Sequence, residues 1–243
     1  MNIYGKTDIG KVRQENQDTF AYGKPSEDTC FAFVCDGMGG QNGGNIASQI
    51  TRDILVERFF RGLNQKLTQD IAQKVIYDAY ENANNVIINK SIVDSTLKGM
   101  GTTVVGAIVA DDNLWIGHVG DSRAYLYSDG MLTKLTTDHS YVQMLVEQGD
   151  ITEEEARNHP RRNEITRAIG VVTGVEFDFM ARKLRDNDKL LLCTDGLTGV
   201  CSDDEIKEVL DSCNDIKQCV NRLVSFANSN GGNDNITVVI LEK

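Results

Sequence analysis

The chain has 243 residues, of which 40% are hydrophobic and 25% are charged, values that are typical of a globular protein. Its formal net charge of −11 disfavours nucleic acid and anionic membranes as partners, because both would repel it. No apolar run approaches the roughly 20 residues that span a bilayer, and the N-terminal MNIYGKTDIG has no signal-peptide pattern, so we expect a cytoplasmic protein without membrane insertion.

The first half of the chain predicts two strands, two helices and then a run of further strands. Apolar residues recur at helical spacing from Gly44 onward, for example at Ile46 and Ile50. The Asp129-Gly130 pair between two apolar segments is a strong hairpin signal. The predicted strands cover 18–22, 29–35, 101–110, 113–120, 122–128 and 131–135, and the predicted helices run from Gly44 and over 67–89.

The second half of the chain opens with an irregular polar segment, residues 139–170. Two pairs, Thr152 with Glu155 and Ser202 with Glu205, fit the capping box that begins a helix. The predicted elements of this half are helices near 140–148, after Ser202 and over 215–228, a hairpin of 175–184 with 188–196 that turns at RDND, and a closing strand at 235–243.

The order of these elements indicates the fold class. The strands come as antiparallel hairpins, with two helices early in the chain and two late. Strict alternation of strand and helix is absent, which argues against a Rossmann fold or a barrel. An α+β fold of antiparallel sheets flanked by helices fits better. Only two prolines occur and no Ser/Gly/Pro-rich linker is present, which predicts a single domain over residues 1–243.

Five aspartates stand where predicted strands begin or end. Asp36 and Asp195 close the apolar runs FAFVCDG and LLLCTDG, and Asp121 ends a third run. Asp18 and Asp234 stand at the starts of strands. Each of them alone fits an ordinary turn residue, but four of the five abut apolar runs that must be buried. If these strand ends converge, several carboxylates share one cleft.

Clustered carboxylates raise one another's pKa unless cations neutralise them, and all-oxygen ligands select hard ions such as Mg²⁺ or Mn²⁺. Zinc is disfavoured because the three histidines, His118, His139 and His159, lack the spacing of a zinc site. A carboxylate-bridged metal pair makes a hydroxide near neutral pH and supports in-line displacement at a phosphate ester. Arg13, just ahead of the acidic group, either forks two phosphate oxygens or lies solvated at the surface.

Eight segments of the chain, in order, extend this picture. They are VRQENQD, DGMGG, GMGTTVVGAIV, VGDSRAYLY, LTTDHSYV, NEITRAIG, CTDGL and GGNDNITVVIL, and together they cover nearly the whole chain. They resemble the metal-dependent protein serine/threonine phosphatases of type 2C, in their short bacterial form. The resemblance implies a four-layer α-β-β-α sandwich, with two central antiparallel sheets between helix pairs. It also implies hydrolysis of phosphoserine and phosphothreonine in proteins, by attack of a metal-bridging hydroxide on phosphorus.

The resemblance assigns ligands for two Mn²⁺ or Mg²⁺ ions. Asp36 would bridge the two ions, and the carbonyl oxygen of Gly37 would bind the second of them. Asp195 and Asp234 would hold the first ion. Asp18 would act on the second ion, largely through water.

The resemblance also assigns positions around this metal pair. Arg13 would grip the substrate phosphate, and Asp121 matches the ligand of a third, weaker metal in which Asp195 also takes part. Asn235 would support the loop that carries Asp234. The segment from about 139 to 170 corresponds to a mobile flap beside the cleft.

The chain departs from the family at one functional position. Some members place a histidine two residues after the bridging aspartate, as a candidate general acid, and this chain has Met38 there. Some bacterial members carry a histidine three residues after the position of Met38, where this chain has Gln41. A serine alkoxide is a poor leaving group without a proton. Either a metal-bound water supplies that proton, or the enzyme is slower on alkyl phosphates than on aryl phosphates.

The polar segment 139–170 carries four arginines in an otherwise acidic chain. They either dock phosphopeptides or belong to a solvated, mobile segment. The four are Arg157, Arg161, Arg162 and Arg167.

We expect a monomer, since no heptad or amphipathic tail suggests an oligomer. We also expect the enzyme to oppose serine/threonine protein kinases. A pseudoenzyme that binds a partner without turnover is the alternative from another class. It predicts the loss of a metal-binding aspartate, and all of them are present. A dedicated regulator that acts on one phosphoprotein would share the same fold and chemistry. Cysteine-based and haloacid-dehalogenase-type phosphatases are excluded because neither a C-x₅-R loop nor a D-x-D-x-T/V motif occurs.

Overall fold

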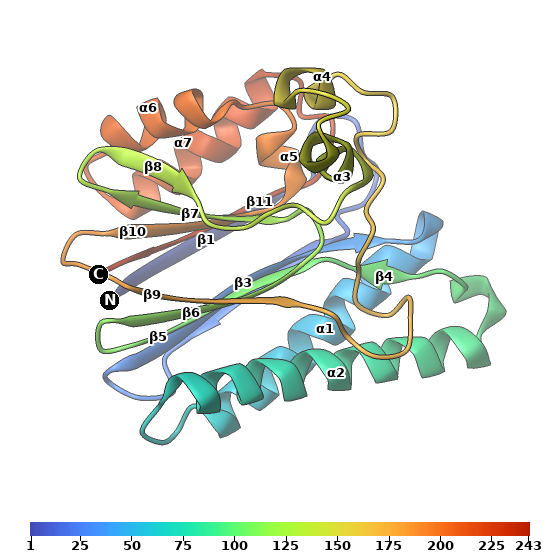
Figure 1. Cartoon of the computed structure of the whole chain (residues 1–243), viewed down its shortest axis with the longest axis horizontal. Helices are drawn as coiled ribbons and strands as arrows, with labels where there is room; N and C mark the ends of the chain where they lie inside the picture. The colour runs from blue at the N-terminus through green and yellow to red at the C-terminus, as the bar shows by residue number, and fades with distance from the viewer.

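The structure, a computed structural model of the whole chain, describes residues 1–39 and 43–243. Gln41, singled out above as a possible acid position, lies outside the described residues. Figure 1 shows two stacked β-sheets between two layers of helices. The predicted four-layer α-β-β-α sandwich is thereby confirmed.

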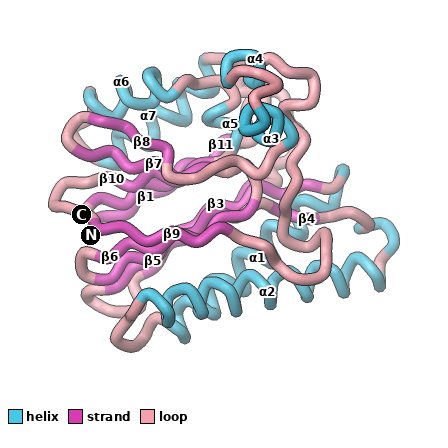
Figure 2. The backbone as a smooth tube through the Cα atoms, in the orientation of Figure 1, coloured by secondary structure: helices cyan, strands magenta, loops and turns pink.

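Two antiparallel sheets form the inner layers, and Figure 2 shows their strands facing each other across the centre of the molecule. The first sheet has the order β1-β11-β10-β7-β8, and the second has the order β2-β3-β5-β6-β9 with β4 paired to β3. The first sheet consists of β1 (Asn2–Asp8), β11 (Ile236–Glu242), β10 (Lys189–Cys193), β7 (Arg123–Ser128) and β8 (Met131–Lys134). The second consists of β2 (Asp18–Gly23), β3 (Thr29–Met38), β5 (Val104–Ala110), β6 (Asn113–Val119), β9 (Asp178–Lys183) and β4 (Gly101–Thr102).

Helix pairs cover the outer face of each sheet. The long helices α1 (Gly40–Gly62) and α2 (Gln69–Val93) pack on the second sheet, and α6 (Asp203–Asp211) and α7 (Ile216–Ser229) pack on the first (Figure 1). Four short elements complete the chain: the 3₁₀ turn η1 (Ser95–Leu97), α5 (Asp195–Thr198) after β10, and the pair α3 (Tyr141–Gln148) and α4 (Glu153–Arg157) at one end of the sandwich. Within the described residues, no helix combines the length and the apolar character that a membrane span requires.

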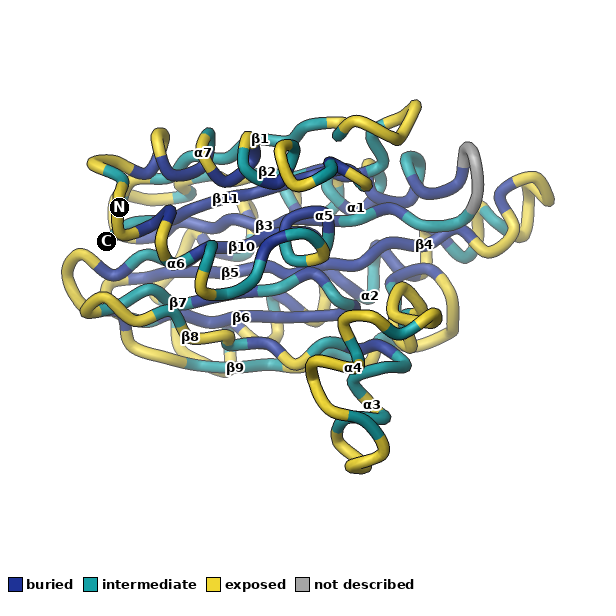
Figure 3. Tube along the Cα trace, turned by 90° about the horizontal axis from the view of Figure 1, so that it is seen from above, coloured by how far each residue is buried: buried dark blue, intermediate teal, exposed yellow. Residues whose placement is uncertain are grey.

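The sequence FAFVC is apolar without interruption because strand β3 lies between two apolar layers. Its odd-numbered residues Phe31 and Phe33 pack under α1 and α2, while the intervening Ala32 and Val34 face the other sheet. Because successive side chains of a strand point to opposite faces, a strand between two apolar layers must be apolar throughout. Figure 3 shows β3, β5 and β11 buried along most of their lengths.

The predicted hairpin of 175–184 with 188–196 is wrong. Strand β9 pairs with β6 in the second sheet, whereas β10 pairs with β7 and β11 in the first. The connection RDND therefore crosses from one sheet to the other. Its backbone is held by the C-terminal residue, because Asn187 N donates to Lys243 O and Lys243 N donates to Asp188 O. Periodicity alone detected both strands but could not assign their partners.

Three elements were missed by the sequence analysis, one of them the three-residue turn η1. Strand β1 is half-exposed along its length and shows no clear alternation, although it pairs with β11 from Asn2↔Glu242 to Asp8↔Ile236. Helix α5 is only one turn long. By contrast, the Asp129-Gly130 hairpin and both predicted capping boxes are confirmed.

Candidate active site

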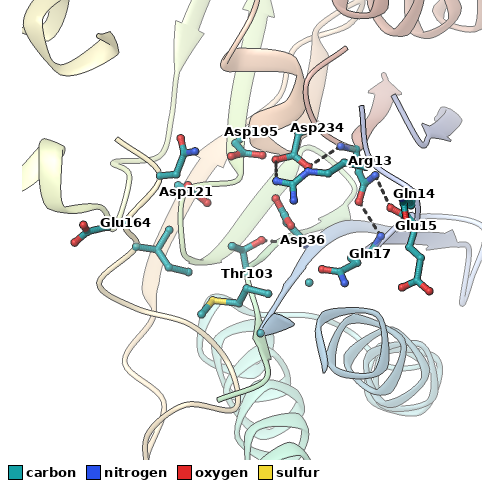
Figure 4. Close-up of a pocket in the computed structure, with 16 residues that line it drawn as sticks. Arg13, Gln14, Glu15, Gln17, Asp36, Thr103, Asp121, Glu164, Asp195 and Asp234 are labelled. Atoms are coloured by element: carbon teal, nitrogen blue, oxygen red, sulfur yellow. Dashed lines mark hydrogen bonds and ion pairs between the residues drawn. The ribbon is translucent and has the colours of Figure 1, made fainter. Parts of the chain in front are cut away.

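The five aspartates come together at one end of the two sheets. Asp18 and Asp36 lie directly opposite each other on β2 and β3. Asp195 follows β10, Asp234 precedes β11, and Asp121 follows β6. Figure 4 shows Asp36, Asp195 and Asp234 around one opening, with Asp121 to one side. The predicted convergence of these strand ends is present in the structure.

A cavity of about 930 Å³ lies over this cluster. Its lining includes Arg13, Asp36, Asp121, Asp195 and Asp234. Gly37 and Met38 also line it, as do residues 163–165 of the flap segment (residues 139–170), none of which was singled out as a site residue from the sequence. Asp18 is not among the lining residues and lies beneath them, 5% exposed.

Glycine follows Asp36 and Asp195 because, at each of these positions, another backbone segment lies too close to leave room for a side chain. A Cβ atom on Gly37 would lie 2.1 Å from the carbonyl oxygen of Gly44. A Cβ atom on Gly196 would lie 1.8 Å from the carbonyl oxygen of Asn235. The first pair thus packs the end of β3 against α1, and the second packs the start of α5 against the residue before β11.

Asn235 joins the N-terminal loop to the start of β11. Its Oδ1 accepts a hydrogen bond from Gln17 N (2.8 Å), and its Nδ2 donates to Ile9 O (3.0 Å) and Glu15 O (2.9 Å). The loop between those residues carries Arg13, whose Nη2 lies 2.6 Å from Asp234 Oδ2. The only cation paired with this cluster among the described residues is therefore held in place by the residue next to Asp234.

Burial governs the protonation of the cluster in the metal-free protein. It raises the pKa of Asp36 well above the usual range, and the charges of Asp18 and Asp195 raise it further. Burial likewise raises the pKa of Asp18 to about 7, although hydrogen bonds from Thr237 and Thr194 act in the opposite direction. The pKa values of Asp121 and Asp195 are also raised, mainly by burial. Without a metal, the cluster retains protons that aspartates normally lose.

The site fits hard divalent cations. Asp18 Oδ1 and Asp195 Oδ1 are buried and, in the described part of the chain, have no hydrogen-bond partner. Such orphaned oxygens are costly unless an ion or water binds them. Carboxylate and carbonyl oxygens are the donors that Mg²⁺ and Mn²⁺ prefer.

This electrostatic arrangement predicts a particular pH dependence of stability. Between the unfolded value of 3.8 and the folded value of about 7 for Asp18, the folded metal-free protein binds more protons than the unfolded chain. Its free energy of unfolding should therefore fall as the pH rises through this window. We expect the Tm of chelator-treated protein to drop from about pH 5 to about pH 8, and Mn²⁺ to reverse the loss. A Tm that rises across this window in the absence of metal would contradict the assignment.

A second polar cluster lies at the base of the flap segment. His118, His139 and Asp178 form the one trio of potential ligands, among the described residues, whose ligand atoms lie within 4.8 Å of one another. However, Arg167 Nη1 lies 3.1 Å from both His139 Nε2 and Asp178 Oδ1. A cation already occupies this contact, and the two imidazole rings are stacked with their centroids 4.6 Å apart. The trio therefore fits an ion-paired anchor better than a metal site.

His139 connects this anchor to the loop of Asp121. Its backbone N donates to Gly120 O (2.8 Å), and its ring Nδ1 accepts from Gly120 N (3.1 Å). Its backbone O accepts from Thr166 N (2.8 Å). His139 thus ties both ends of the flap segment to the strand end that carries Asp121, a role that its position in a loop did not predict.

Comparison with known proteins identifies the family and the fold. Residues 10–238 match the family model described as protein phosphatase 2C. The chain belongs to the protein phosphatase 2C family. The serine/threonine phosphatase stp of Listeria monocytogenes is 37% identical over 243 residues, covering 100% of this chain and 96% of the relative. The expectation of a protein-serine/threonine phosphatase, made from eight sequence segments, is confirmed at the level of the family.

Solved structures of other protein phosphatase 2C members agree. The serine/threonine phosphatase of S. agalactiae has a TM-score of 0.93 and 35% identity, covering 100% of this chain and 99% of the other. The catalytic domain of the serine/threonine protein phosphatase PstP, solved in complex with two manganese ions, has a TM-score of 0.85 and 34% identity, covering 99% and 97%. At these identities, the similarity extends beyond the fold to the protein family.

Proposed function

We propose that this protein phosphatase 2C member hydrolyses phosphoserine and phosphothreonine in proteins, using two Mn²⁺ or Mg²⁺ ions. The observation that carries the proposal is the convergence of buried carboxylates from separate strands on one cavity. The two manganese ions in the related PstP structure support the choice of metal. The ligands would be Asp18, Asp36, Gly37, Asp195 and Asp234, with Asp121 and Asp195 at a third, weaker site.

The bound ions would supply Lewis acidity and lower the pKa of water. The protein would supply position and charge. Asp36, at the end of a buried strand, is fixed by its backbone, since its N–H donates to Thr103 Oγ1 and its carbonyl oxygen accepts from Thr102 Oγ1 and Thr103 N. Arg13 lies at the cavity rim with 54% of its side chain exposed. It can exchange Asp234 for two oxygens of a substrate phosphate, a geometry that suits a guanidinium group.

The direct test is hydrolysis of a phosphothreonine peptide by the purified protein with Mn²⁺, with a chelator, and with Mn²⁺ restored. We expect activity only in the presence of metal, and none on a phosphotyrosine peptide of the same sequence. Activity that survives chelation would reject the metal proposal. A folded, Mn²⁺-loaded protein without activity on any phosphopeptide would favour the pseudoenzyme alternative.

Met38 allows a prediction about the leaving group. Met38 lines the cavity, but a thioether cannot donate a proton. General acid catalysis contributes about 10²–10⁴-fold, so we expect kcat on an aryl phosphate to exceed kcat on a phosphoserine peptide by at least about tenfold. Met38→His should raise the rate on phosphoserine much more than the rate on the aryl ester. Equal rates and equal pH profiles for the two wild-type reactions would count against this reasoning.

The proposal extends to the setting of the reaction. The substrates would be phosphoproteins, including a serine/threonine kinase whose action this enzyme opposes. The chain would work as a monomeric single domain in the cytoplasm, with residues 139–170 as a flap beside the cavity. All six cysteines are free in the structure, which is in keeping with a reducing compartment.

A further inference from the structure

A second cavity, of about 580 Å³, adjoins the candidate active site. One wall includes residues between 140 and 163 of the flap segment, and the other includes residues between 198 and 205, from the end of α5 to the first turn of α6. We call this cavity the flank groove. It shares Asp121, Asn163 and Asp195 with the catalytic cavity. A peptide whose phosphorylated residue occupies the catalytic cavity can therefore continue into the flank groove.

Three of the six acidic side chains that line the flank groove have hydrogen-bond donors within the fold. Asp138 accepts three hydrogen bonds of 2.6–3.0 Å from Arg123. Asp203 accepts from the Tyr125 hydroxyl (3.0 Å), and Glu205 completes the capping box of α6. The charge of Asp138 is thus balanced by a cation, and the carboxylates of Asp203 and Glu205 are held by neutral donors.

The four arginines of the flap segment divide into two groups. Arg161 donates two hydrogen bonds to the Glu164 carboxylate, from Nε to Oε1 (2.7 Å) and from Nη2 to Oε2 (2.6 Å). It also stacks on the Tyr141 ring, with its guanidinium carbon 3.6 Å from the ring centroid. Arg167 is paired with Asp178 in the anchor described above. These two arginines stabilise the flap segment itself.

Arg157 and Arg162 differ from that pair. Both line the flank groove, and in the described part of the chain neither side chain has an ion pair or hydrogen bond. Arg157 acts on Glu205 only at longer range, by lowering its pKa after the larger effect of the capping hydrogen bonds. An unpaired guanidinium group in a groove is suited to bind a carboxylate through two parallel hydrogen bonds.

We propose that the flank groove binds the peptide segment beside the phosphorylated residue, and that Arg157 and Arg162 select substrates with an acidic side chain in that segment. This inference rests on the proposed phosphatase function. It replaces a general positive patch of four arginines with two specificity-determining residues. The acidic catalytic cavity and the net charge of −11 would otherwise disfavour acidic peptides, so the two arginines supply the local attraction that such substrates need.

The test compares two phosphothreonine peptides that differ only in flanking Glu versus Gln residues, with a small aryl phosphate as third substrate. The variant is Arg157→Gln/Arg162→Gln. The matched control is Arg58→Gln/Arg182→Gln, which removes the same charge from exposed positions on α1 and β9. Exposed ion pairs contribute modestly to binding free energy. Because the variant loses two such pairs with the Glu peptide, we expect KM for that peptide to rise about tenfold. KM for the Gln peptide and kcat/KM for the aryl phosphate should change less than about twofold, as should all values for the control.

An equal rise in KM for both peptides, or no rise for either, would overturn the proposal. Binding of the same peptides with a non-hydrolysable phosphonate, measured by fluorescence anisotropy, gives a readout that does not require turnover. Tighter binding of the Glu peptide by the wild type, lost in the double variant, would support the groove even if hydrolysis fails. Wild-type binding that does not distinguish the peptides, or no binding, would reject it. If the protein binds the Glu peptide selectively but hydrolyses neither peptide, the phosphatase proposal is rejected and the groove proposal stands.

Discussion

Asp36→Asn should abolish catalysis and, at the same time, make the metal-free protein more stable. In the proposed site, Asp36 would hold both ions, and charge stabilisation by such ions contributes several kcal/mol. Each 1.36 kcal/mol corresponds to a factor of ten, so we expect kcat on a phosphothreonine peptide to fall by at least about 10³-fold. The neutral amide removes a buried carboxylate whose pKa is raised by burial and by Asp18.

The rise in stability distinguishes this substitution from simple damage. Ionising a buried acid costs free energy, so the metal-free variant should have a higher Tm than the metal-free wild type at about pH 8. Added Mn²⁺ should raise the Tm of the wild type and have a smaller effect on the variant. Asp53→Asn, the same change on an exposed residue of α1, should alter neither activity nor the Mn²⁺ effect. An Asp36→Asn protein with wild-type kcat would refute the assigned role.

Gly196→Ala should have the largest effect on stability. The added Cβ atom would lie 1.8 Å from the carbonyl oxygen of Asn235 and 2.7 Å from its carbon, and neither backbone atom can rotate away. Overpacking of this kind usually costs about 1–3 kcal/mol and occasionally more. We expect the upper end, at least about 3 kcal/mol in the free energy of unfolding, measured by urea denaturation.

Gly130→Ala is the matched control for this prediction. Gly130 has a φ of +75°, and nothing lies within 4 Å of its added Cβ atom, so only backbone strain of about 1–2 kcal/mol is expected. Moving Asn235 should also displace the loop that carries Arg13, so any folded Gly196→Ala protein should bind Mn²⁺ and substrate weakly. If Gly196→Ala is as stable as Gly130→Ala, the backbone of Gly196 does not lie against that of Asn235, and the prediction is wrong.

Antiparallel strands flanked by helices could be predicted because burial controls the sequence pattern of each strand, whereas the four-layer arrangement was implied by the family resemblance. β3 is apolar at successive residues since Phe33 and Val34 enter different apolar layers. Strand partners could not be predicted in the same way. The loop between β9 and β10 crosses between sheets because the two strands pair with β6 and with β7 and β11, and its backbone bonds to Lys243 at the far end of the sequence. The half-exposed β1 has no pattern to detect.

The candidate site was predictable in composition but not in arrangement. Aspartates at the ends of apolar strands indicated a cluster, and the family resemblance supplied their roles. The direct pairing of Asp18 with Asp36 depends on strand register, which local sequence does not determine. The stacking of Arg161 on Tyr141 and the pairing of Arg167 with Asp178 likewise depend on how the chain folds back on itself. For that reason the sequence could not separate these two arginines from Arg157 and Arg162.

The most direct test of the metal site is anomalous diffraction at the manganese edge from crystals grown with Mn²⁺. The proposed site predicts two strong peaks in contact with Asp36, one of them also within reach of Asp195 and Asp234, and a weaker third peak beside Asp121. Manganese bound at His118 and His139 instead, or no peak at Asp36 in a crystal saturated with Mn²⁺, would contradict it.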